Sequence, residues 1–574
     1  MTSHIVTSRR SVLGLMAGGA AGLTGGGAAA ARVQEAITAE TLACSESLFA
    51  VSYTDEERAQ LVRTMEDWSA RAEALRAHHR PNTLAPALSF DPRLPGRSYR
   101  TQANALGGVP GEAGRCPRAA ADIAFAPVWQ QAAWMARGEL SSAELTEIYL
   151  DRIARYAGQL ECFITITAER ARGEAAARDA ERAAGRVRGP LHGIPYALKD
   201  IVDVAGLPAT WGATPYRERV GEETAVAAAR LEEAGAVLLG KTSVGALAYG
   251  DIWFDGVCRN PFNPNEGSSG SSAGSASATA AGLCSFSIGT ETLGSIVSPS
   301  HRCGTAGLRP SFGRVARTGA MALCWSLDKI GPITRHVADT AYVLGVINGA
   351  DAGDPASFDR GFDCDFSGDL AGLRLGYNPQ WLEQGHELDR QALDAARSLG
   401  VELVPFEIGE LPYAALLIQL EAEAAAVFEE LSLSGADAQL RWQDDEAWPN
   451  TFRRARFISG IDLVNADRLR REVMSMMHDR MDGLDAVIGP NFAGNMLLAT
   501  NFTGHPQLVL RAGFHQQPTR TLSGEAAGDG GDLFDVPYAT SLWAPLFEEG
   551  TLVRLGHAIE SRLGAAARRP PGLD

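Results

Sequence analysis

The chain has 574 residues, a hydrophobic content of 45% and a formal net charge of −17 at pH 7. This composition is typical of a folded protein with a large core, and the length allows up to about four domains of roughly 150 residues. The excess of carboxylates argues against a nucleic-acid partner and against binding to anionic membranes, because phosphate groups require clustered Lys and Arg.

The first 31 residues have the pattern of an export signal. The segment from Thr7 to Leu13 contains two adjacent arginines and resembles a twin-arginine motif, and an apolar stretch rich in Gly and Ala follows it to about Ala31. This stretch is less apolar than the roughly 20 strongly apolar residues of a membrane span, so we favour a cleaved signal over a membrane anchor. The sequence therefore predicts a periplasmic or secreted protein with no stable membrane insertion after processing.

Residues 32–120 are predicted to form a helical N-terminal extension and a connector. Between Glu56 and His79 apolar residues recur every three or four positions, which predicts a helix with one apolar stripe. Pro81 ends this pattern, and residues 86–116 are rich in Pro and Gly, as irregular connectors are.

Residues 121–565 have the pattern of an α/β enzyme, and residues 566–574 are predicted to be a C-terminal tail. Ser141 to Glu144 is a capping box that predicts a helix through Tyr156. Residues 194–204 and 236–239 predict short buried strands, a helix is predicted over 552–563, and the acidic, Gly-rich residues 524–535 predict a surface loop. None of the eight cysteines forms a C-x-x-C pair, so no metal site is indicated, and disulfide pairing cannot be derived.

A stretch rich in Ser, Gly and Ala covers residues 267–282, and a second Gly/Ser turn ends at Ser295. This composition is also typical of a flexible linker. Linkers do not usually run directly into an Ala-rich helix, a buried strand and another Gly/Ser turn. On composition alone, a linker and a functional loop are equally favoured.

Two familiar motifs occur here and are rejected. Residues 235–242 fit the phosphate-binding pattern G-x-x-x-x-G-K-T, but their central Ala-Val-Leu-Leu predicts a buried strand and not a loop around phosphate. Gly270 to Gly274 fit the G-x-S-x-G nucleophile elbow, which would make Ser272 the nucleophile. That elbow requires a strand directly before the serine and a supporting histidine. Asn and Pro residues precede it instead, and no context supports any downstream histidine (His301, His336, His478 or His505).

Lys199 ends an apolar strand that begins near Leu191. A lysine can activate a serine if it is neutral, and desolvation by apolar surroundings favours the neutral amine. The alternative is a buried ion pair between Lys199 and Asp200 or Asp203, which the residues alone leave open.

The segment Leu191–Asp200, the Ser/Gly stretch and the Ser295 turn, in this order and spacing, resemble the amidase signature family. Further resembling segments include residues 260–264, 304–310, 328–332 and 503–506, so that the resemblance runs from about 124 to 563. It implies an α/β fold with a large, twisted, mixed β-sheet flanked by helices on both faces, here with a helical N-terminal extension.

The resemblance also implies a Lys–Ser–Ser triad whose bridging serine follows a cis peptide bond. In the family this serine lies 24 positions before the nucleophile, which selects Ser271 when Ser295 is the nucleophile. Ser295 would attack an amide carbonyl while Ser271 relays its proton to neutral Lys199, and water would hydrolyse the acyl-enzyme. The oxyanion would be stabilised by the backbone N–H groups of the nucleophile turn: Thr292, Leu293, Gly294 and Ser295. The implied substrate is a small-molecule amide, and no cofactor or metal is implied.

The nucleophile turn departs from the usual family pattern, which is Gly-Gly-Ser with Asp before it and Arg after it. Here Leu293 adds a side chain to the turn, and Val297 stands where a positive charge is usual. The loss of that charge disfavours a small carboxylate-bearing substrate.

Other functions remain as alternatives. An A-type subunit of the tRNA-dependent amidotransferase is disfavoured by the export signal and the acidic charge, and a non-catalytic homologue by the three retained triad residues. An esterase could use the same triad. The substrate (aliphatic, aryl, peptide or fatty amide) and the oligomeric state, including a homodimer, are left open.

Tyr249, Trp253 and Phe254 either line an apolar acyl pocket or belong to the core, and the core is favoured.

Overall fold

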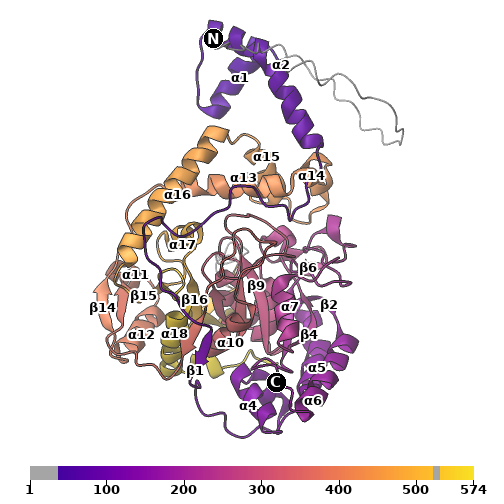
Figure 1. Cartoon of the computed structure of the whole chain (residues 1–574), viewed down its shortest axis with the longest axis vertical. Coiled ribbons are helices and arrows are strands. Elements are labelled where there is room, and N and C mark those ends of the chain that lie inside the picture. The colour runs from indigo at the N-terminus through magenta and orange to yellow at the C-terminus, as the bar shows by residue number, and fades with distance from the viewer. Residues whose placement is uncertain (1–36, 521–530, 574) are drawn as a thin grey trace, which may run out of the picture. The chain divides into compact units, whose positions relative to one another are not determined.

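The computed structural model of the chain describes residues 37–520 and 531–573 (Figure 1). It divides into two units, 1–79 and 80–574, so that the division falls inside the segment predicted as extension and connector. The predicted export signal lies outside the described residues, as does most of the predicted acidic loop. Among the described residues no helix is both long and apolar enough to cross a bilayer.

The described part of the first unit contains two helices, α1 (Ala39–Phe49) and α2 (Asp55–Ala77). A capping box begins α2, since Thr54 Oγ1 accepts a hydrogen bond from the Glu57 amide and the Glu57 carboxylate accepts one from the Thr54 amide. The helix predicted over 56–79 is thereby confirmed.

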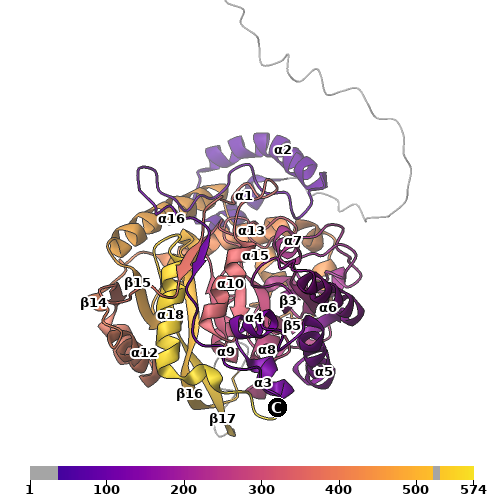
Figure 2. The same cartoon turned by 60° about the horizontal axis from the view of Figure 1, so that its bottom comes forward.

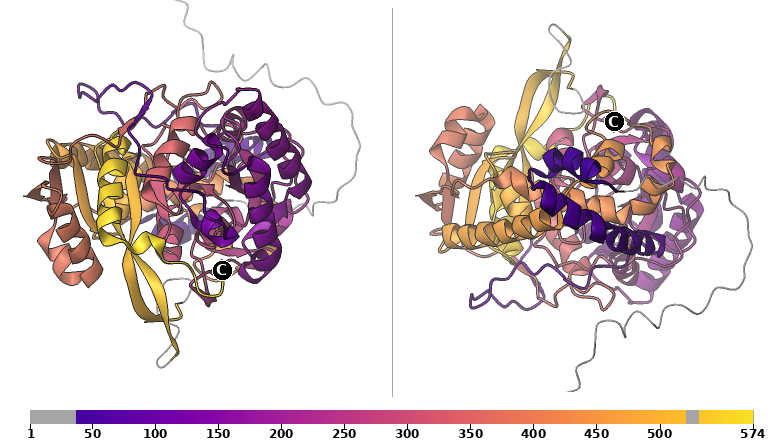
Figure 3. Two further views of the ribbon diagram at one scale, coloured as in Figure 1. Left: turned by 90° about the horizontal axis from the view of Figure 1, so that it is seen from below. Right: turned by 90° about the horizontal axis from the view of Figure 1, so that it is seen from above.

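The second unit is built on an eleven-stranded mixed sheet. In spatial order its strands are β14 (Glu402–Pro405), β13 (Arg374–Tyr377), β15 (Ala486–Pro490), β17 (Leu533–Trp543), β16 (Gln507–Pro518), β10 (Ala306–Arg309), β11 (Lys329–Thr334), β9 (Phe286–Glu291), β3 (Pro195–Lys199), β4 (Val237–Thr242) and β2 (Phe163–Ile166). Strand β3 is parallel to both β4 and β9, and β13 is parallel to both β14 and β15, whereas the other pairs are antiparallel. Figure 3 shows β16 and β17 as a long hairpin.

Helices cover both faces of this sheet, as Figure 2 shows. The helices described in this unit are α3 (Ala120–Phe125), α4 (Val128–Ala136), α5 (Ser142–Leu160), α6 (Ala168–Ala183), α7 (Val226–Glu233), α8 (Ala273–Ala280), α9 (Val297–Cys303), α10 (Val337–Ile347), α11 (Pro379–Gln384), α12 (Glu387–Arg397), α13 (Leu417–Val427), α14 (Glu429–Leu433), α15 (Trp448–Ala455), α16 (Gly460–Met481), α17 (Met496–Thr503) and α18 (Glu549–Leu563). Short strand pairs lie outside the sheet: β1 (Ala105–Gly107) with β12 (Asp363–Asp365), β5 (Ile252–Trp253) with β6 (Gly256–Val257), and β7 (Arg259–Asn260) with β8 (Asn263–Gly267).

The alternation of side chains along β16 separates the two faces. Val509 clusters with Val297 of α9, whereas Leu508 and Leu510 face Gly556 of α18. Helices α8 and α9 pack together against one face, and α10 and α18 pack together against the other. The predicted fold class, a large mixed sheet between helices, is confirmed.

Element boundaries follow local signals where these exist. The capping box at Ser141 and Glu144 is formed, and α5 continues to Leu160, four residues past the predicted end. The strand predicted over 194–204 ends at Lys199, because the Lys199 carbonyl accepts a hydrogen bond from the Val202 amide in a tight turn.

Strands β3 and β9 lie side by side and parallel, so their carboxyl ends meet at one edge of the sheet. The segment before α8 and the turn before α9 reach the same edge, since α8 packs on both strands and α9 packs on α8. Residues from three separate segments are thereby brought together.

Candidate active site

Lys199 is fully buried at the end of β3, and its ammonium or amine nitrogen contacts only oxygen atoms of uncharged groups. Its Nζ lies 2.8 Å from Ser271 Oγ, 3.0 Å from Ser272 Oγ and 2.8 Å from Thr290 Oγ1. Burial lowers the pKa of Lys199 well below its ordinary value, and the charges of Asp328 and Glu291 offset only part of that shift. A neutral amine beside a serine hydroxyl can accept a proton from it.

The ion-pair alternative for Lys199 is not formed in the structure. Asp200 pairs with Lys241 at 3.3 Å and accepts a hydrogen bond from the Thr210 amide, and Asp203 pairs with Arg219. The pair formed by Asp200 and Lys241 also explains the rejected phosphate motif. Lys241 lies in β4, all of whose residues are buried, and its Nζ also donates to the Pro208 carbonyl at 3.2 Å.

Ser271 follows a cis peptide bond with Gly270 and is 1% exposed. The backbone here packs closely against a neighbouring loop. A Cβ atom at Gly270 would lie 1.9 Å from the Gly250 carbonyl oxygen, so only glycine fits this position. This close packing sets the Ser271 hydroxyl against Lys199.

Ser272 does not have the surroundings of a nucleophile elbow. Its side chain is fully buried, with Oγ donating to the Thr290 carbonyl at 3.0 Å and accepting from the Thr290 amide at 3.1 Å. Two of the histidines considered for the elbow have other hydrogen-bond partners. His301 Nδ1 bonds to the Ala539 carbonyl, and His505 Nδ1 bonds to Thr503 Oγ1. The elbow stays rejected, and Ser272 is a hydrogen-bond partner of Lys199.

Ser295 lies in the turn between β9 and α9, which we call the nucleophile turn (residues 291–297). Its carbonyl accepts a hydrogen bond from the Ser272 amide at 3.1 Å, which ties the two serine segments together. Gly294 has a φ of +92°, a conformation that favours glycine. Thr292, Leu293 and Ser295 line a cavity of about 330 Å³, so the predicted nucleophile and part of the predicted oxyanion turn face one space.

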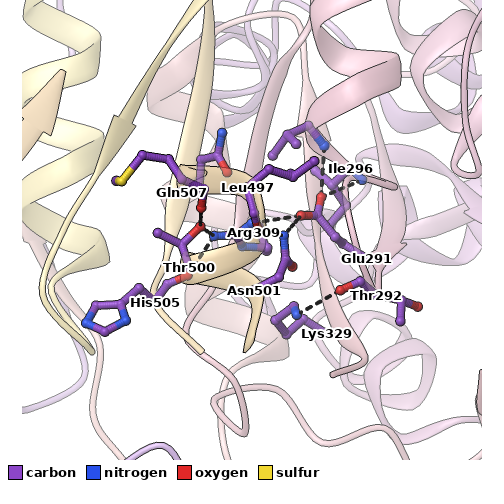
Figure 4. Close-up of polar contacts among 12 residues, drawn as sticks. Glu291, Thr292, Ile296, Arg309, Lys329, Leu497, Thr500, Asn501, His505 and Gln507 are labelled. Carbon is purple, nitrogen blue, oxygen red and sulfur yellow. Dashed lines mark hydrogen bonds and ion pairs between the residues drawn. The ribbon is translucent and has the colours of Figure 1, made fainter. Parts of the chain in front are cut away.

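A buried carboxylate closes the nucleophile turn on itself (Figure 4). Glu291 Oε2 accepts hydrogen bonds from the backbone amides of Ile296 (2.8 Å) and Val297 (3.0 Å). Its Oε1 accepts from Arg309 Nη1 at 2.8 Å and Asn501 Nδ2 at 3.1 Å. Four donors therefore satisfy this carboxylate, and its bonds span the turn that carries Ser295.

The charges around Glu291 keep it ionised. Burial alone would raise its pKa, but Arg309 and Lys329 hold the pKa of Glu291 below its ordinary value. Arg309 is held in turn by Thr500 Oγ1 (2.8 Å) and the His505 carbonyl (2.9 Å). The network thus joins the turn to β10 and to the segment around α17.

Thr292 is fixed by a second pair of contacts. Its hydroxyl donates to Asp328 Oδ1 at 2.6 Å, and its carbonyl accepts from Lys329 Nζ at 3.4 Å. No pattern in the sequence marks Glu291, Arg309 or Asn501 as site residues. Arg309, Asp328 and Lys329 lie in the segments 304–310 and 328–332 that resemble the family, and this resemblance is the signal that could have found them.

The model of the Amidase family matches residues 144–512 of the chain. The chain belongs to the amidase family. Its resemblance to that family, stated from the sequence, is thereby confirmed.

Several relatives of this amidase-family chain are similar over most of their length. It is 31% identical over 474 residues to a glutamyl-tRNA(Gln) amidotransferase subunit of Anaeromyxobacter sp. (strain K), covering 76% of this chain and 96% of that relative. It is 34% identical over 372 residues to an amidase of Pseudomonas putida, covering 61% and 76%. With the corresponding amidotransferase subunit of Roseiflexus sp. (strain RS-1) it shares 40% identity over 301 residues, and there it spans only 62% of the relative's length.

Among solved structures, this amidase-family fold is similar to the native peptide amidase from Stenotrophomonas maltophilia. The TM-score is 0.67 at 31% identity, and the match covers 78% of this chain and 98% of that one. A bacterial aryl acylamidase of the amidase signature family, at 21% identity and a TM-score of 0.65, matches in fold.

The three aromatic residues considered for an acyl pocket have different positions. Tyr249 lines the cavity beside Ser295. Trp253 is 7% exposed and meets Phe254 edge to face at 4.9 Å, and neither lines this cavity. Within the described residues, no group of three or more His, Cys, Asp or Glu side chains is arranged to hold a metal ion.

We expect the buried amine of Lys199 to make stability depend on pH. Between its lowered pKa and the ordinary value of 10.5, the unfolded chain binds one proton at this residue that the folded chain does not bind. Its contribution to stability therefore falls as pH falls through that window. Relative to wild type, Lys199→Met should gain in free energy of unfolding as the pH is lowered from 10 to 7, measured by urea denaturation. A difference independent of pH would contradict a depressed pKa.

We expect Glu291→Gln to lower kcat about 10–100-fold with little change in KM, because a turn displaced by about an ångström misplaces both the predicted nucleophile and the predicted oxyanion donors. It should also cost about 3–5 kcal/mol of stability, since Arg309 is left buried without its counter-charge. Steady-state kinetics and thermal unfolding measure these effects.

Glu549→Gln is the matched control for this substitution. Glu549 is also fully buried, pairs with Arg314 at 2.8 Å and accepts from the Ser311 amide, but it has no contact with the nucleophile turn. It should lose stability and keep kcat. Equal loss of kcat in both variants would mean that Glu291 acts through stability alone.

Proposed function

We propose that the chain hydrolyses a carboxylic amide C–N bond through an acyl-enzyme on Ser295. One observation carries the proposal: the buried Lys199 amine has no carboxylate contact and is hydrogen-bonded to Ser271 Oγ at 2.8 Å. The next residue, Ser272, is hydrogen-bonded to Ser295, which lines a cavity. The named amidases among the similar proteins support the same reaction.

In the proposed acylation, Ser295 Oγ attacks the carbonyl carbon and its proton passes to Ser271, whose own proton passes to the neutral amine of Lys199. The backbone amides of residues 292–295 stabilise the oxyanion. The proton then returns through Ser271 to the leaving nitrogen, the C–N bond breaks, and ammonia or an amine departs. Water then attacks the Ser295 ester and passes a proton through Ser271 to Lys199; that proton returns to Ser295 Oγ as the carboxylic acid leaves and ionises to the carboxylate.

The hydrogen bonds between Glu291 and the nucleophile turn support this mechanism, because oxyanion donors are most effective when they are fixed before the charge develops. An amide nitrogen needs protonation as it leaves, so the relay through Ser271 matters more for amides than for esters. The ratio of kcat/KM for a matched anilide and ester measures the preference of the enzyme for amides over esters. An undetectable anilide rate with fast ester hydrolysis would make the protein an esterase.

We expect a fluorophosphonate probe to label the purified protein at Ser295, located by mass spectrometry. Labelling should be absent in Ser295→Ala and strongly slowed in Lys199→Ala, and each variant should lose more than about 1,000-fold in kcat/KM for an amide. Labelling at Ser272 instead would overturn the assignment.

We also propose that the chain is exported by a twin-arginine-type signal. We propose further that its substrates are small amides and that it has no nucleic-acid partner. The support is the Arg9-Arg10 pair before the Gly/Ala-rich stretch and the net charge of −17. Replacement of both arginines by lysine should leave the protein in the cytoplasm, measured by cell fractionation. Unchanged periplasmic accumulation would exclude this route.

A further inference from the structure

The cavity beside Ser295 has walls of two kinds. Its apolar wall is formed by Leu293, Leu323, Leu417, Leu420 and Trp448. Its rim carries charged groups, namely Glu421, Asp445, Glu446 and Arg454. We call it the acyl cavity. Its volume of about 330 Å³ is at the lower end of the range for small-molecule sites, large enough for one phenylalkyl or branched alkyl group.

The apolar wall is held in place by aromatic packing. Trp448 is 8% exposed and donates its indole N–H to the Leu247 carbonyl at 3.0 Å, so its polar edge is satisfied. Its ring stacks on Phe452 with centroids 5.2 Å apart and contacts Tyr249 at 5.1 Å. Because these side chains are already fixed, an apolar ligand group can pack against the wall without the cost of ordering it.

The rim is acidic. Among the described residues that line the cavity, the single cation is Arg454, and it pairs with Glu421 at 2.6 Å. Asp445 and Glu446 add two further carboxylates, so the rim has a net negative charge. Val297, which stands where the family usually has arginine, is fully buried with Val509 and Ala539 and supplies no charge to the cavity.

Resting on the proposed function, we propose that the acyl cavity binds the acyl group of the substrate and selects apolar acyl groups without negative charge. The acyl group stays bonded to Ser295 until water enters the place that the amine has left. A cavity with apolar walls suits the retained group, because water for deacylation then enters from the other side. Each methylene buried there should improve kcat/KM about fourfold.

The test compares primary amides, which release only ammonia and leave the acyl group as the sole occupant. The values of kcat/KM are measured for acetamide, for 4-phenylbutanamide and for the analogue of 4-phenylbutanamide that carries a carboxylate at the para position of its ring. We expect 4-phenylbutanamide to exceed acetamide by at least about 100-fold. The carboxylate analogue should fall about three- to tenfold or more below its neutral parent, less so at high salt, because exposed charges are screened.

Two variants assign these effects to residues. Leu417→Ala, at a half-buried position, should lower kcat/KM for 4-phenylbutanamide about tenfold and for acetamide less than twofold. The double variant Asp445→Asn, Glu446→Gln should recover several-fold of the activity lost with the carboxylate analogue. Glu383→Gln, at an exposed carboxylate of α11, is the charge control and should change neither ratio.

Failure of this inference is separable from failure of the proposed function. Equal kcat/KM for acetamide and 4-phenylbutanamide, unchanged in Leu417→Ala, would overturn the acyl cavity and leave amide hydrolysis intact. If the enzyme hydrolyses none of the amides, the proposed function fails, and calorimetry on Ser295→Ala decides the cavity. Binding of 4-phenylbutanamide but not of its carboxylate would support the assignment, and equal or absent binding would overturn it.

Discussion

The proposed chemistry of this site depends on keeping a lysine amine out of water and without a direct carboxylate contact. Lys199 achieves this although three carboxylates lie near it, because each of them is bound to other groups. Asp200 pairs with Lys241, Glu291 with Arg309, and Asp328 accepts from Thr292 and from two backbone amides. The amine is left with three hydroxyl groups and the Thr290 carbonyl as partners, and desolvation favours its neutral form.

The same interior charges shape the nucleophile turn. A fully buried ion pair adds little to stability by itself, since desolvation offsets most of the Coulomb attraction. Its value here is geometric. Glu291 uses one oxygen for Arg309 and Asn501 and the other for the amides of Ile296 and Val297, so strand β10, helix α17 and the nucleophile turn are joined through one carboxylate. Glu291 thus connects the two features, because its charge acts on the buried Lys199 and its hydrogen bonds order the nucleophile turn.

The sequence predicted those features that have local or family-wide signals. The capping box located α5, and the resemblance selected Lys199, Ser271 and Ser295, two of which the structure brings into contact. The contact between Glu291 and Asn501 joins residues 210 positions apart and leaves no local pattern. Leu417 and Leu420 also read as ordinary core positions of a helix, because apolar periodicity does not distinguish a cavity wall from a packed core. Only the tertiary arrangement separates the two.

The long sequence separation within the Glu291 network has a consequence for biosynthesis. Lys199, Ser271 and Ser295 all leave the ribosome before Asn501, whose amide completes the carboxylate's set of donors. At about 5–20 residues per second, some 10–40 seconds pass between synthesis of the turn and of its last partner. A nascent or prematurely terminated chain therefore carries Ser295 without the Asn501 contact to Glu291, and the set of donors to this carboxylate is complete only after residue 501 has been synthesised.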